Sequence, residues 1–382
     1  MHDQAPIPPS SPQTALEDVE TAQGWRWQMA HRVCTLAQME PHLTLSGSER
    51  SGFSAPGLPV VAVTPYYLSL MDPTDARCPI RQQALPHPDD VQRGVGERTD
   101  PLGERERTPV PGLIHRYPDR AVLLVAADCP VRCRHCNRRR RDPGELIGGD
   151  AGLEEAVRYL QGAPQVREVI LSGGDPLTLD DAALERICGR LRSVRHIEVL
   201  RVHTRAPVTC PMRVTDDLAR VLAAAGPLYV VTQFNHPREV TPEAAAACAR
   251  LVDAGLPMAN QSVLLRGVNS DDAILAALCR ALVRIRVRPY YLFQLDPVVG
   301  SERFRTPVAA GIELVSGMRG RISGLSIPTF ALDAPGGFGK VALASPAIVS
   351  TAPGLVRVRT WRGEVASYPD TGDSDLTCPP WP

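Results

Sequence analysis

Between residues 120 and 319 the sequence alternates six times between a short apolar segment and an amphipathic one. Apolar runs of this length that are rich in Val, Ile and Leu are typical of buried strands, and the segments between them have helical spacing. The predicted strands cover residues 120–127, 167–172, 197–204, 227–234, 257–265 and 288–294. The predicted helices cover residues 151–161, 179–193, 214–225, 241–254, 271–284 and 307–319. This alternation predicts an α/β fold of parallel βα units, in an open doubly wound sheet or an incomplete barrel.

The regions outside this repeat lack its pattern. We divide the chain into a disordered tail (1–22), a helical and irregular wrapping segment (23–119), the core (120–325) and a C-terminal extension (326–382). In the wrapping segment a helical pattern begins at Trp25 and continues toward Met39, and the many later prolines favour short helices over a sheet. The extension contains a strand-like segment at 328–333 and a terminal hairpin that begins at Leu355.

Three cysteines follow the first predicted strand, in the order Cys129-Pro-Val-Arg-Cys133-Arg-His-Cys136. Ligands of parallel sheets gather at the carboxyl ends of the strands, so this loop is a candidate site. Three thiolates at this spacing can bind an iron–sulfur cluster and leave one iron of a four-iron cluster without a protein ligand. A disulfide is disfavoured because nothing indicates secretion, and zinc would need a fourth ligand because His135 is poorly placed. We therefore predict a 4Fe-4S cluster with an open coordination position.

Charge and hydropathy indicate a small-molecule partner. The 42 basic and 42 acidic residues balance, so no overall field attracts nucleic acid or an anionic membrane. No apolar stretch reaches the length of a membrane span, and the N-terminus lacks the pattern of a signal peptide. We expect a cytoplasmic protein, which also suits an oxidation-sensitive cluster.

Lysine occurs once, at Lys340, among 42 basic residues. Arginine cannot replace lysine where an amine must form a Schiff base, because the guanidinium stays protonated. The glycine-rich stretch Asp333-Ala-Pro-Gly-Gly-Phe-Gly-Lys340 is a loop that could hold the amine against a flat cofactor such as pyridoxal 5′-phosphate (PLP). The pattern alone fits a lysine in a surface turn equally well.

Polar residues at other strand ends could bind a ligand or could have an ordinary structural role. Gly173-Gly174-Asp175 follows the second strand and allows close backbone approach, although the same letters make an ordinary turn. The run that begins at Arg138 is a solvated patch or a clamp for a carboxylate.

Arg116 and Arg120 precede the first strand and are either phosphate ligands or surface residues. Asp296 and Asp333 stand at two further strand ends, where aspartates commonly form turns. If both point into the pocket, they form an anionic receptor for a cationic side chain.

Taken in order, these motifs resemble those of the lysine 2,3-aminomutase family of radical S-adenosylmethionine (SAM) enzymes, from about Trp25 to about Tyr368. The matching stretches are His115-Arg-Tyr-Pro-Asp-Arg120, the cysteine motif, Leu171-Ser-Gly-Gly-Asp-Pro-Leu177, Phe234-Asn-His-Pro237, Asn260-Gln-Ser-Val-Leu-Leu-Arg-Gly-Val-Asn269, Arg288-Pro-Tyr-Tyr291 and the stretch that ends in Lys340. The resemblance implies an incomplete (β/α)6 barrel that uses a 4Fe-4S cluster, SAM and PLP.

The resemblance also implies roles for particular residues. These are Cys129, Cys133 and Cys136 for the cluster; Gly173, Gly174, Asp175 and His236 for SAM; Lys340 as the catalytic lysine on PLP, with Arg116, Tyr117 and Arg120; and Arg138, Asp296 and Asp333 for the substrate. In these roles Arg138 binds the substrate carboxylate, and the two aspartates bind the distal ammonium.

The implied reaction moves the 2-amino group of L-lysine to carbon 3, through a 5′-deoxyadenosyl radical and a PLP external aldimine. It also implies an external electron donor of the flavodoxin or ferredoxin type. Arginine is the alternative substrate, because two carboxylates also suit a guanidinium, whereas a glutamate-specific enzyme should not need them. A zinc- or RNA-binding protein is a remote alternative, disfavoured by the neutral charge and the lone lysine.

The chain departs from the family pattern at several positions. Phe293 and Leu295 stand where family members carry Tyr and Cys, and Phe338 interrupts the glycine run before the lysine. Some members bind zinc between subunits through cysteines early in the fifth helix and near the C-terminus. This chain has Asp271-Asp272 in the first region and only Cys378 in the second, so no structural zinc is expected and a homo-oligomer is left open.

Overall fold

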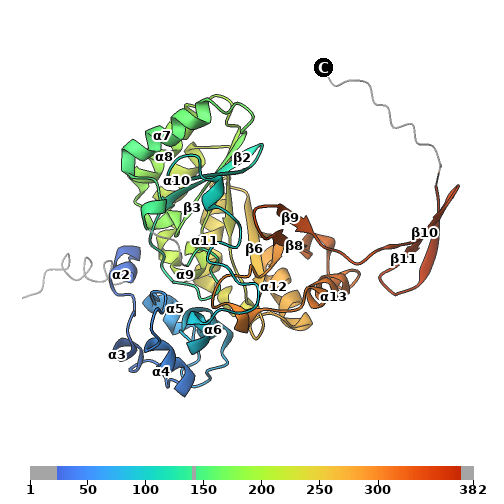
Figure 1. Ribbon diagram of the computed structural model, residues 1–382, viewed down its shortest axis with the longest axis horizontal. Coiled ribbons are helices and arrows are strands. Elements are labelled where there is room, and N and C mark those ends of the chain that lie inside the picture. The colour runs from blue at the N-terminus through green and yellow to red at the C-terminus, as the bar shows by residue number, and fades with distance from the viewer. Residues whose placement is uncertain (1–23, 140–142, 371–382) are drawn as a thin grey trace, which may run out of the picture.

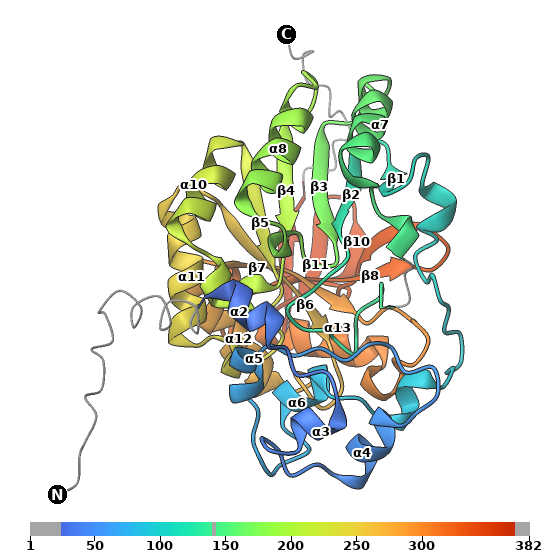
Figure 2. The ribbon, with the colours of Figure 1, turned by 90° about the vertical axis from the view of Figure 1, so that its left-hand side faces the viewer.

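In the computed structural model, which describes residues 24–139 and 143–370, nine strands form one sheet whose order follows the chain. The strands are β1 Leu113–Tyr117, β2 Arg120–Ala126, β3 Glu168–Gly173, β4 Val199–His203, β5 Leu228–Thr232, β6 Met258–Leu264, β7 Arg288–Gln294, β8 Thr329–Ala334 and β9 Gly339–Ala342. Strands β2 to β8 run parallel, whereas β1 and β9 add to the two edges in antiparallel orientation. The sheet curls into a nearly closed barrel (Figure 2).

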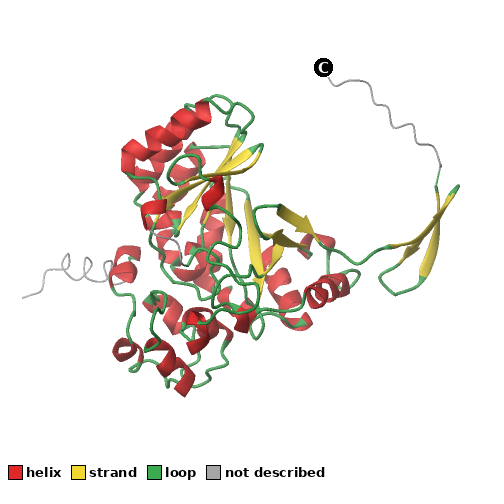
Figure 3. Ribbon diagram, viewed as in Figure 1, coloured by secondary structure: helices red, strands yellow, loops and turns green. Residues whose placement is uncertain are grey.

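Helices cover the outside of this barrel (Figures 1 and 3). They are α7 Gly149–Gln161, α8 Asp181–Arg192, α10 Asp216–Ala224, α11 Pro242–Asp253, α12 Asp272–Arg284 and α13 Val308–Met318, with a short α9 Ala206–Thr209 after β4. Four of them begin where an Asp or Thr side chain accepts a hydrogen bond from the first turn, at Asp180, Thr215, Thr241 and Asp271. These caps help to explain why helix starts could be predicted locally.

Side chains on the strands alternate between the helices and the barrel interior. In β6, Met258 and Leu264 are buried, whereas Gln261 and Val263 between them are partly exposed and line the interior cavity. Leu123, Leu171 and other fully buried apolar residues form the core between sheet and helices. The interior is therefore left open for polar side chains.

The six predicted strands and six predicted helices are all present, and the incomplete (β/α)6 barrel is confirmed. The strand-like segment at 328–333 becomes β8, a seventh parallel strand. Strand β1 has no counterpart among the predicted strands, because its partner β2 begins only three residues after it ends and its second half is polar. The predicted glycine-rich loop is present as a tight turn at 335–338, but its two ends are strands: Asp333 pairs with Lys340, so the lysine lies on β9.

Short helices of the wrapping segment pack below the barrel, in blue and cyan in Figure 2. They are α2 Trp25–Ala30, α3 Leu36–Met39, α4 Gly47–Phe53, α5 Pro65–Ser69 and α6 Pro79–Ala84. The expected continuous helix from Trp25 toward Met39 was wrong. Its middle is extended, because Val33 forms an antiparallel bridge with Val63. The same Val63 also bridges Val131, so this segment supports the cysteine loop.

The C-terminal extension forms a second, three-stranded antiparallel sheet that projects away from the barrel (Figures 1 and 3). Its strands are β10 Ile348–Ala352, β11 Leu355–Arg359 and β12 Val365–Pro369, of which the last two are the predicted hairpin. Apolar side chains on it are exposed, including Ile348 at 61% and Tyr368 at 65%. We call this sheet the C-terminal arm.

Residues 1–22, Arg140, Arg141 and Cys378 lie outside the described residues, so the expectations for the tail, the end of the arginine run and the C-terminal cysteine fall there. Within residues 24–139 and 143–370, no helix combines the length and the apolar character that crossing a membrane requires.

Candidate active site

A cavity of about 310 Å³ runs from the carboxyl ends of the strands into the barrel interior. Every strand from β1 to β9 contributes to its lining, as does the loop after β2. The predicted site residues that line it are Cys129, Cys133, Cys136, Gly173, Gly174, Asp175, Arg116, Tyr117, Arg120, Arg138, Asp296, Asp333 and Lys340. The fold thus brings together residues as far apart in the sequence as Arg116 and Lys340.

The cysteine loop is held in place by the wrapping segment. The backbone N–H of Arg132 donates to the carbonyl of Ala62 at 2.9 Å, and that of Arg134 donates to the carbonyl of Gln83 at 2.8 Å. The guanidinium of Arg134 is itself buried and bonded to Asp90 at 2.8 Å. These contacts hold the backbone of the loop that carries the three cysteines.

The three thiols fit an iron–sulfur cluster. All three are free and line the same cavity. Burial raises the pKa of Cys129 well above its usual range and also raises that of Cys136, so these two thiols keep protons that iron binding would release. In the described part of the chain, no group of three His, Cys, Asp or Glu side chains is arranged to bind a single metal ion. This does not count against a cluster, because each cysteine there binds a different iron.

The glycine motif is bonded directly to the cysteine loop. The backbone N–H of Gly174 donates to the carbonyl of Ala126 at 2.5 Å, and that of Asp175 donates to the carbonyl of Asp128 at 2.7 Å. A Cβ atom at Gly173 would collide with the carbonyl oxygen of Ala126, and φ at Gly173 is +125°. Glycine is therefore required here for the approach of two loops, whatever else it contacts.

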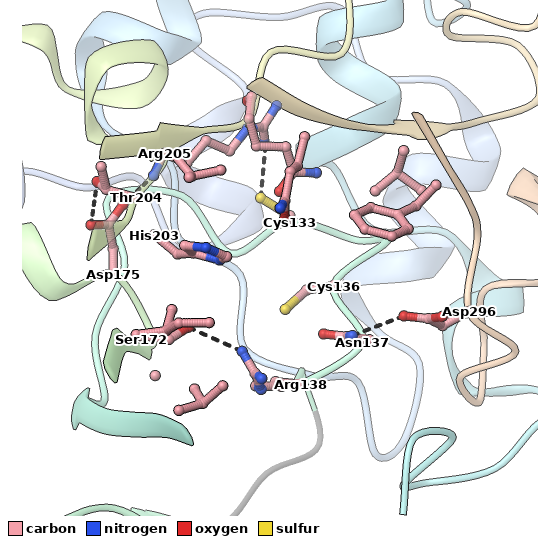
Figure 4. A pocket seen from close by; sticks show the side chains of 18 of the residues that line it. Cys133, Cys136, Asn137, Arg138, Ser172, Asp175, His203, Thr204, Arg205 and Asp296 are labelled. Carbon is pink, nitrogen blue, oxygen red and sulfur yellow. Dashed lines mark hydrogen bonds between the residues drawn. The ribbon is translucent and has the colours of Figure 1, made fainter. Parts of the chain in front are cut away.

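Asp175 joins the ends of β3 and β4 (Figure 4). Its Oδ1 accepts from Thr204 Oγ1 at 2.6 Å and from the backbone N–H of Leu177 at 3.0 Å, and its Oδ2 accepts from the backbone N–H of Arg205 at 2.7 Å. Burial raises its pKa in spite of these donors. Since both oxygens already accept hydrogen bonds, a contact between Asp175 and SAM stays a prediction.

The residues expected around PLP meet across the opening of the barrel. Arg116 on β1 donates to Asp333 Oδ1 on β8 at 2.7 Å, and Lys340 Nζ on β9 lies 3.6 Å from Asp333 Oδ2. The backbone N–H of Lys340 donates to the hydroxyl of Tyr117 at 2.8 Å, and the guanidinium of Arg120 lies 3.9 Å above the Tyr117 ring. The two edge strands are therefore connected by the predicted site residues themselves.

This grouping fits a phosphorylated aromatic cofactor. Two guanidiniums, Arg116 and Arg120, suit an anionic phosphate, and Lys340 supplies an amine. Lys340 Nζ lies 5.5 Å from the ring of Tyr117 and 5.5 Å from that of Phe293, so aromatic faces flank it. Phe338, the departure next to Lys340, is 87% exposed and leaves the cavity undisturbed.

Asp296 and Arg138 line the same cavity, near the cysteine loop (Figure 4). Asp296 Oδ2 accepts from Asn137 Nδ2 at 2.8 Å, and burial followed by the nearby Asp333 raises the pKa of Asp296 to about 7. Arg138 makes two bonds to Glu104, at 2.9 and 2.6 Å, and one to Ser172 at 3.1 Å. A substrate carboxylate would have to share Arg138 with Glu104.

His236 does not line the cavity. It precedes the 3-10 helix Pro237–Glu239, where its Nδ1 accepts from the backbone N–H of Arg238 at 3.1 Å, and burial lowers its pKa. Its predicted contact with SAM is not supported by this position and stays a prediction.

Several lining residues were not predicted. His203 at the end of β4 lines the cavity, and burial lowers its pKa well below the usual range, so it is neutral there. Glu104 and Asn137 pair with predicted residues, and Arg205 donates to Cys133. His203 and Arg205 follow the rule that ligands gather at strand ends, a signal the sequence carries, whereas Glu104 lies in a proline-rich stretch without any such signal.

Comparisons with known proteins agree with this site. The family model for the radical SAM superfamily matches residues 123–278, and the model for lysine-2,3-aminomutase matches residues 315–377. The L-lysine 2,3-aminomutase of Fusobacterium nucleatum subsp. nucleatum is 43% identical over 90% of this chain and 81% of its own. That of Clostridium subterminale is 42% identical over 90% and 83%. The glutamate 2,3-aminomutase of Clostridioides difficile is 37% identical over 92% and 84%.

Proposed function

This chain belongs to the lysine 2,3-aminomutase family of radical SAM enzymes, and we propose that it converts L-lysine into β-lysine by moving the 2-amino group to carbon 3. Membership implies a 4Fe-4S cluster, SAM and a small-molecule substrate. The choice of lysine rests on one observation, the two carboxylates of Asp296 and Asp333 that line the same cavity as Lys340.

We assign the cofactors to the residues that suit their chemistry. Cys129, Cys133 and Cys136 would bind the cluster, and Gly173 and Gly174 beside them would face SAM. Lys340 would bind PLP, with the positive charges of Arg116 and Arg120 toward its phosphate. When bound, the three groups supply a hydrogen-abstracting 5′-deoxyadenosyl radical and a conjugated ring that stabilises an adjacent radical.

The carboxylates give the pocket its preference for a cation. Asp333 forms ion pairs with two positive groups of this chain, Arg116 and the ammonium of Lys340, so a substrate ammonium would share this carboxylate with them. Asp296 carries a proton below about pH 7, and a cation beside it favours the ionised carboxylate. The ammonium of a bound substrate would therefore stabilise the ionised form of Asp296, and the ionised carboxylate would in turn bind the ammonium.

This electrostatic preference separates lysine from glutamate. An L-lysine and a glutamate 2,3-aminomutase both align with about nine tenths of the chain, so overall identity does not by itself decide between the two substrates. A glutamate side chain would bring a third carboxylate beside two buried ones, which is unfavourable without a compensating cation. Arginine is the second candidate, because a guanidinium can also bridge two carboxylates.

The test is a reconstitution of the purified protein under anaerobic conditions with iron, sulfide, PLP, SAM and a reductant. L-Lysine, L-arginine and L-glutamate are then supplied separately, and α- and β-amino acid products are resolved by chromatography. We expect β-lysine as the preferred product and none from Lys340→Ala. β-Arginine as the preferred product would overturn the substrate assignment. SAM cleavage without any β-amino acid would overturn the aminomutase assignment.

We further propose the functional setting of the enzyme. Reduction of the cluster requires an external electron donor, and a flavodoxin or ferredoxin meets that need. A cytoplasmic location suits the thiolate-bound iron, which is sensitive to oxidation. The exposed apolar side chains of the C-terminal arm support a homo-oligomer, because such surfaces are usually covered by a partner.

A further inference from the structure

Arg205 places a positive hydrogen-bond donor on one of the cluster ligands. The residue lies two positions after β4, and its Nη1 is 2.7 Å from Cys133 Sγ (Figure 4). Its side chain is only 9% exposed, so water competes little for this contact. No motif in the sequence marks it, since Cys133 and Arg205 are 72 positions apart.

The guanidinium cannot turn away from the sulfur, because its other donors are also bound. Nη2 donates to Glu239 Oε1 at 2.6 Å and to Gln83 Oε1 at 2.6 Å, and Nε donates to the carbonyl of Gln233 at 3.1 Å. Tyr67 lies within 3.2 Å of the same Nη2 through its hydroxyl. Arg205 is thus clamped between the end of β5 and the wrapping segment.

Its anchor Glu239 is equally well fixed. The carboxylate is fully buried and accepts from Tyr67 at 2.8 Å, from Gln83 at 3.1 Å and from the backbone N–H of Asn235 at 2.6 Å. Buried charges are tolerated when they are paired and hydrogen-bonded in this way. The network therefore delivers a cation to Cys133 at a defined position.

We infer that Arg205 is a positioning residue that orients Cys133 and raises the reduction potential of the cluster, an inference that rests on the proposed function. Cys133 binds iron as a thiolate, and a reduced cluster carries one more negative charge than an oxidised one. A fixed guanidinium at the sulfur stabilises the reduced cluster more, because hydrogen bonds and nearby charge set cluster potentials and act strongly in a buried site. Electron uptake becomes easier as a result.

The test compares Arg205→Gln with the wild-type holoenzyme. Glutamine keeps a polar side chain but removes the positive charge from Cys133. The matched control is Arg201→Gln, which removes a partly buried arginine from β4. Among the described residues Arg201 is paired with Glu168, at 2.5 Å, and forms no hydrogen bond with a cysteine. Each reconstituted protein is assayed for iron and sulfide content and titrated by electron paramagnetic resonance in the absence of SAM.

We expect Arg205→Gln to have a lower midpoint potential than wild type and Arg201→Gln. At the wild-type midpoint, its ratio of reduced to oxidised cluster should fall about tenfold, which corresponds to about 59 mV for a one-electron couple. The midpoint potential of Arg205→Lys should lie between those of Arg205→Gln and the wild type, because the lysine side chain keeps the charge but is too short to bind Glu239 and Cys133 together. A purely structural residue would change the amount of cluster but not the potential of what is bound.

A wild-type midpoint in either loaded Arg205 variant would overturn the inference. The inference would also be overturned if neither Arg205 variant assembled a cluster while Arg201→Gln did. The hydrogen bond between Arg205 and Cys133 would then serve cluster assembly. If the wild-type protein itself assembled no cluster, the proposed function would fail instead.

Discussion

Replacing Asp296 by Asn should stabilise the substrate-free protein, because an ionised Asp296 is costly in the empty pocket. Burial, followed by the nearby Asp333, raises its pKa from the ordinary 3.8 to about 7. A carboxyl group with a raised pKa in the folded state contributes stability that is fully present below the ordinary pKa and is lost as the pH rises through the folded value. The rise from 3.8 to about 7, at about 1.4 kcal/mol for each pH unit, costs about 4 kcal/mol at high pH.

Asparagine keeps an oxygen for Asn137 but cannot ionise. The free energy of unfolding of Asp296→Asn should therefore exceed that of the wild type by about 4 kcal/mol near pH 8 and by only about 2 kcal/mol near pH 5. Urea unfolding at the two pH values, without substrate or PLP, measures both differences. The control Asp217→Asn removes an exposed carboxylate on α10 and should change stability by less than about 1 kcal/mol at either pH.

The same substitution should weaken the binding of lysine, because a charged acceptor is lost. Hydrogen bonds to charged groups are worth about 1.5 to 3 kcal/mol, which corresponds to a rise in KM of roughly tenfold to a hundredfold. If the difference in unfolding free energy between Asp296→Asn and the wild type were equal near pH 5 and pH 8, the raised pKa of Asp296 would be refuted. An unchanged KM would refute its role at the substrate.

Three further outcomes follow from the geometry of the site. The KM of the wild-type enzyme for lysine should fall by up to about tenfold for each pH unit between about pH 5 and pH 7 and then level off, because the substrate ammonium binds the ionised Asp296. Steady-state kinetics measure this dependence, and Asp296→Asn should lack it. After borohydride treatment, mass spectrometry should find PLP attached to the wild type and not to Lys340→Ala, and an adduct on the variant would place the reactive amine elsewhere. Gly173→Ala should lower the melting temperature, since the added Cβ meets the carbonyl of Ala126 and the backbone strain costs at least about 1 to 3 kcal/mol. Gly189→Ala on α8, where the space is open, should instead add about 1 kcal/mol, and equal melting curves would count against the close approach.

The sequence by itself determined the secondary structure of the core and the position of several site residues along it. The six βα units were predictable because strand and helix periodicity, together with caps such as Asp180 and Thr241, depend on neighbouring residues. The end of the first parallel strand also indicated where the cysteines would lie. The chemistry of a single lysine pointed to Lys340 before any fold was known. These inferences needed only neighbouring residues or, for Lys340, the composition of the chain.

The partners of those residues depended on the tertiary structure. Arg116 meets Asp333 only because the curled sheet brings its two edges together. Arg205 reaches Cys133 only because β2 and β4, on either side of β3, end at the same edge of the sheet. His236 matched the family motif, yet it is not one of the residues that line the cavity. Contacts of this kind join positions far apart in the chain, and side-chain direction depends on packing. The sequence by itself therefore determined which chemical groups are present, and the fold decided which of them touch.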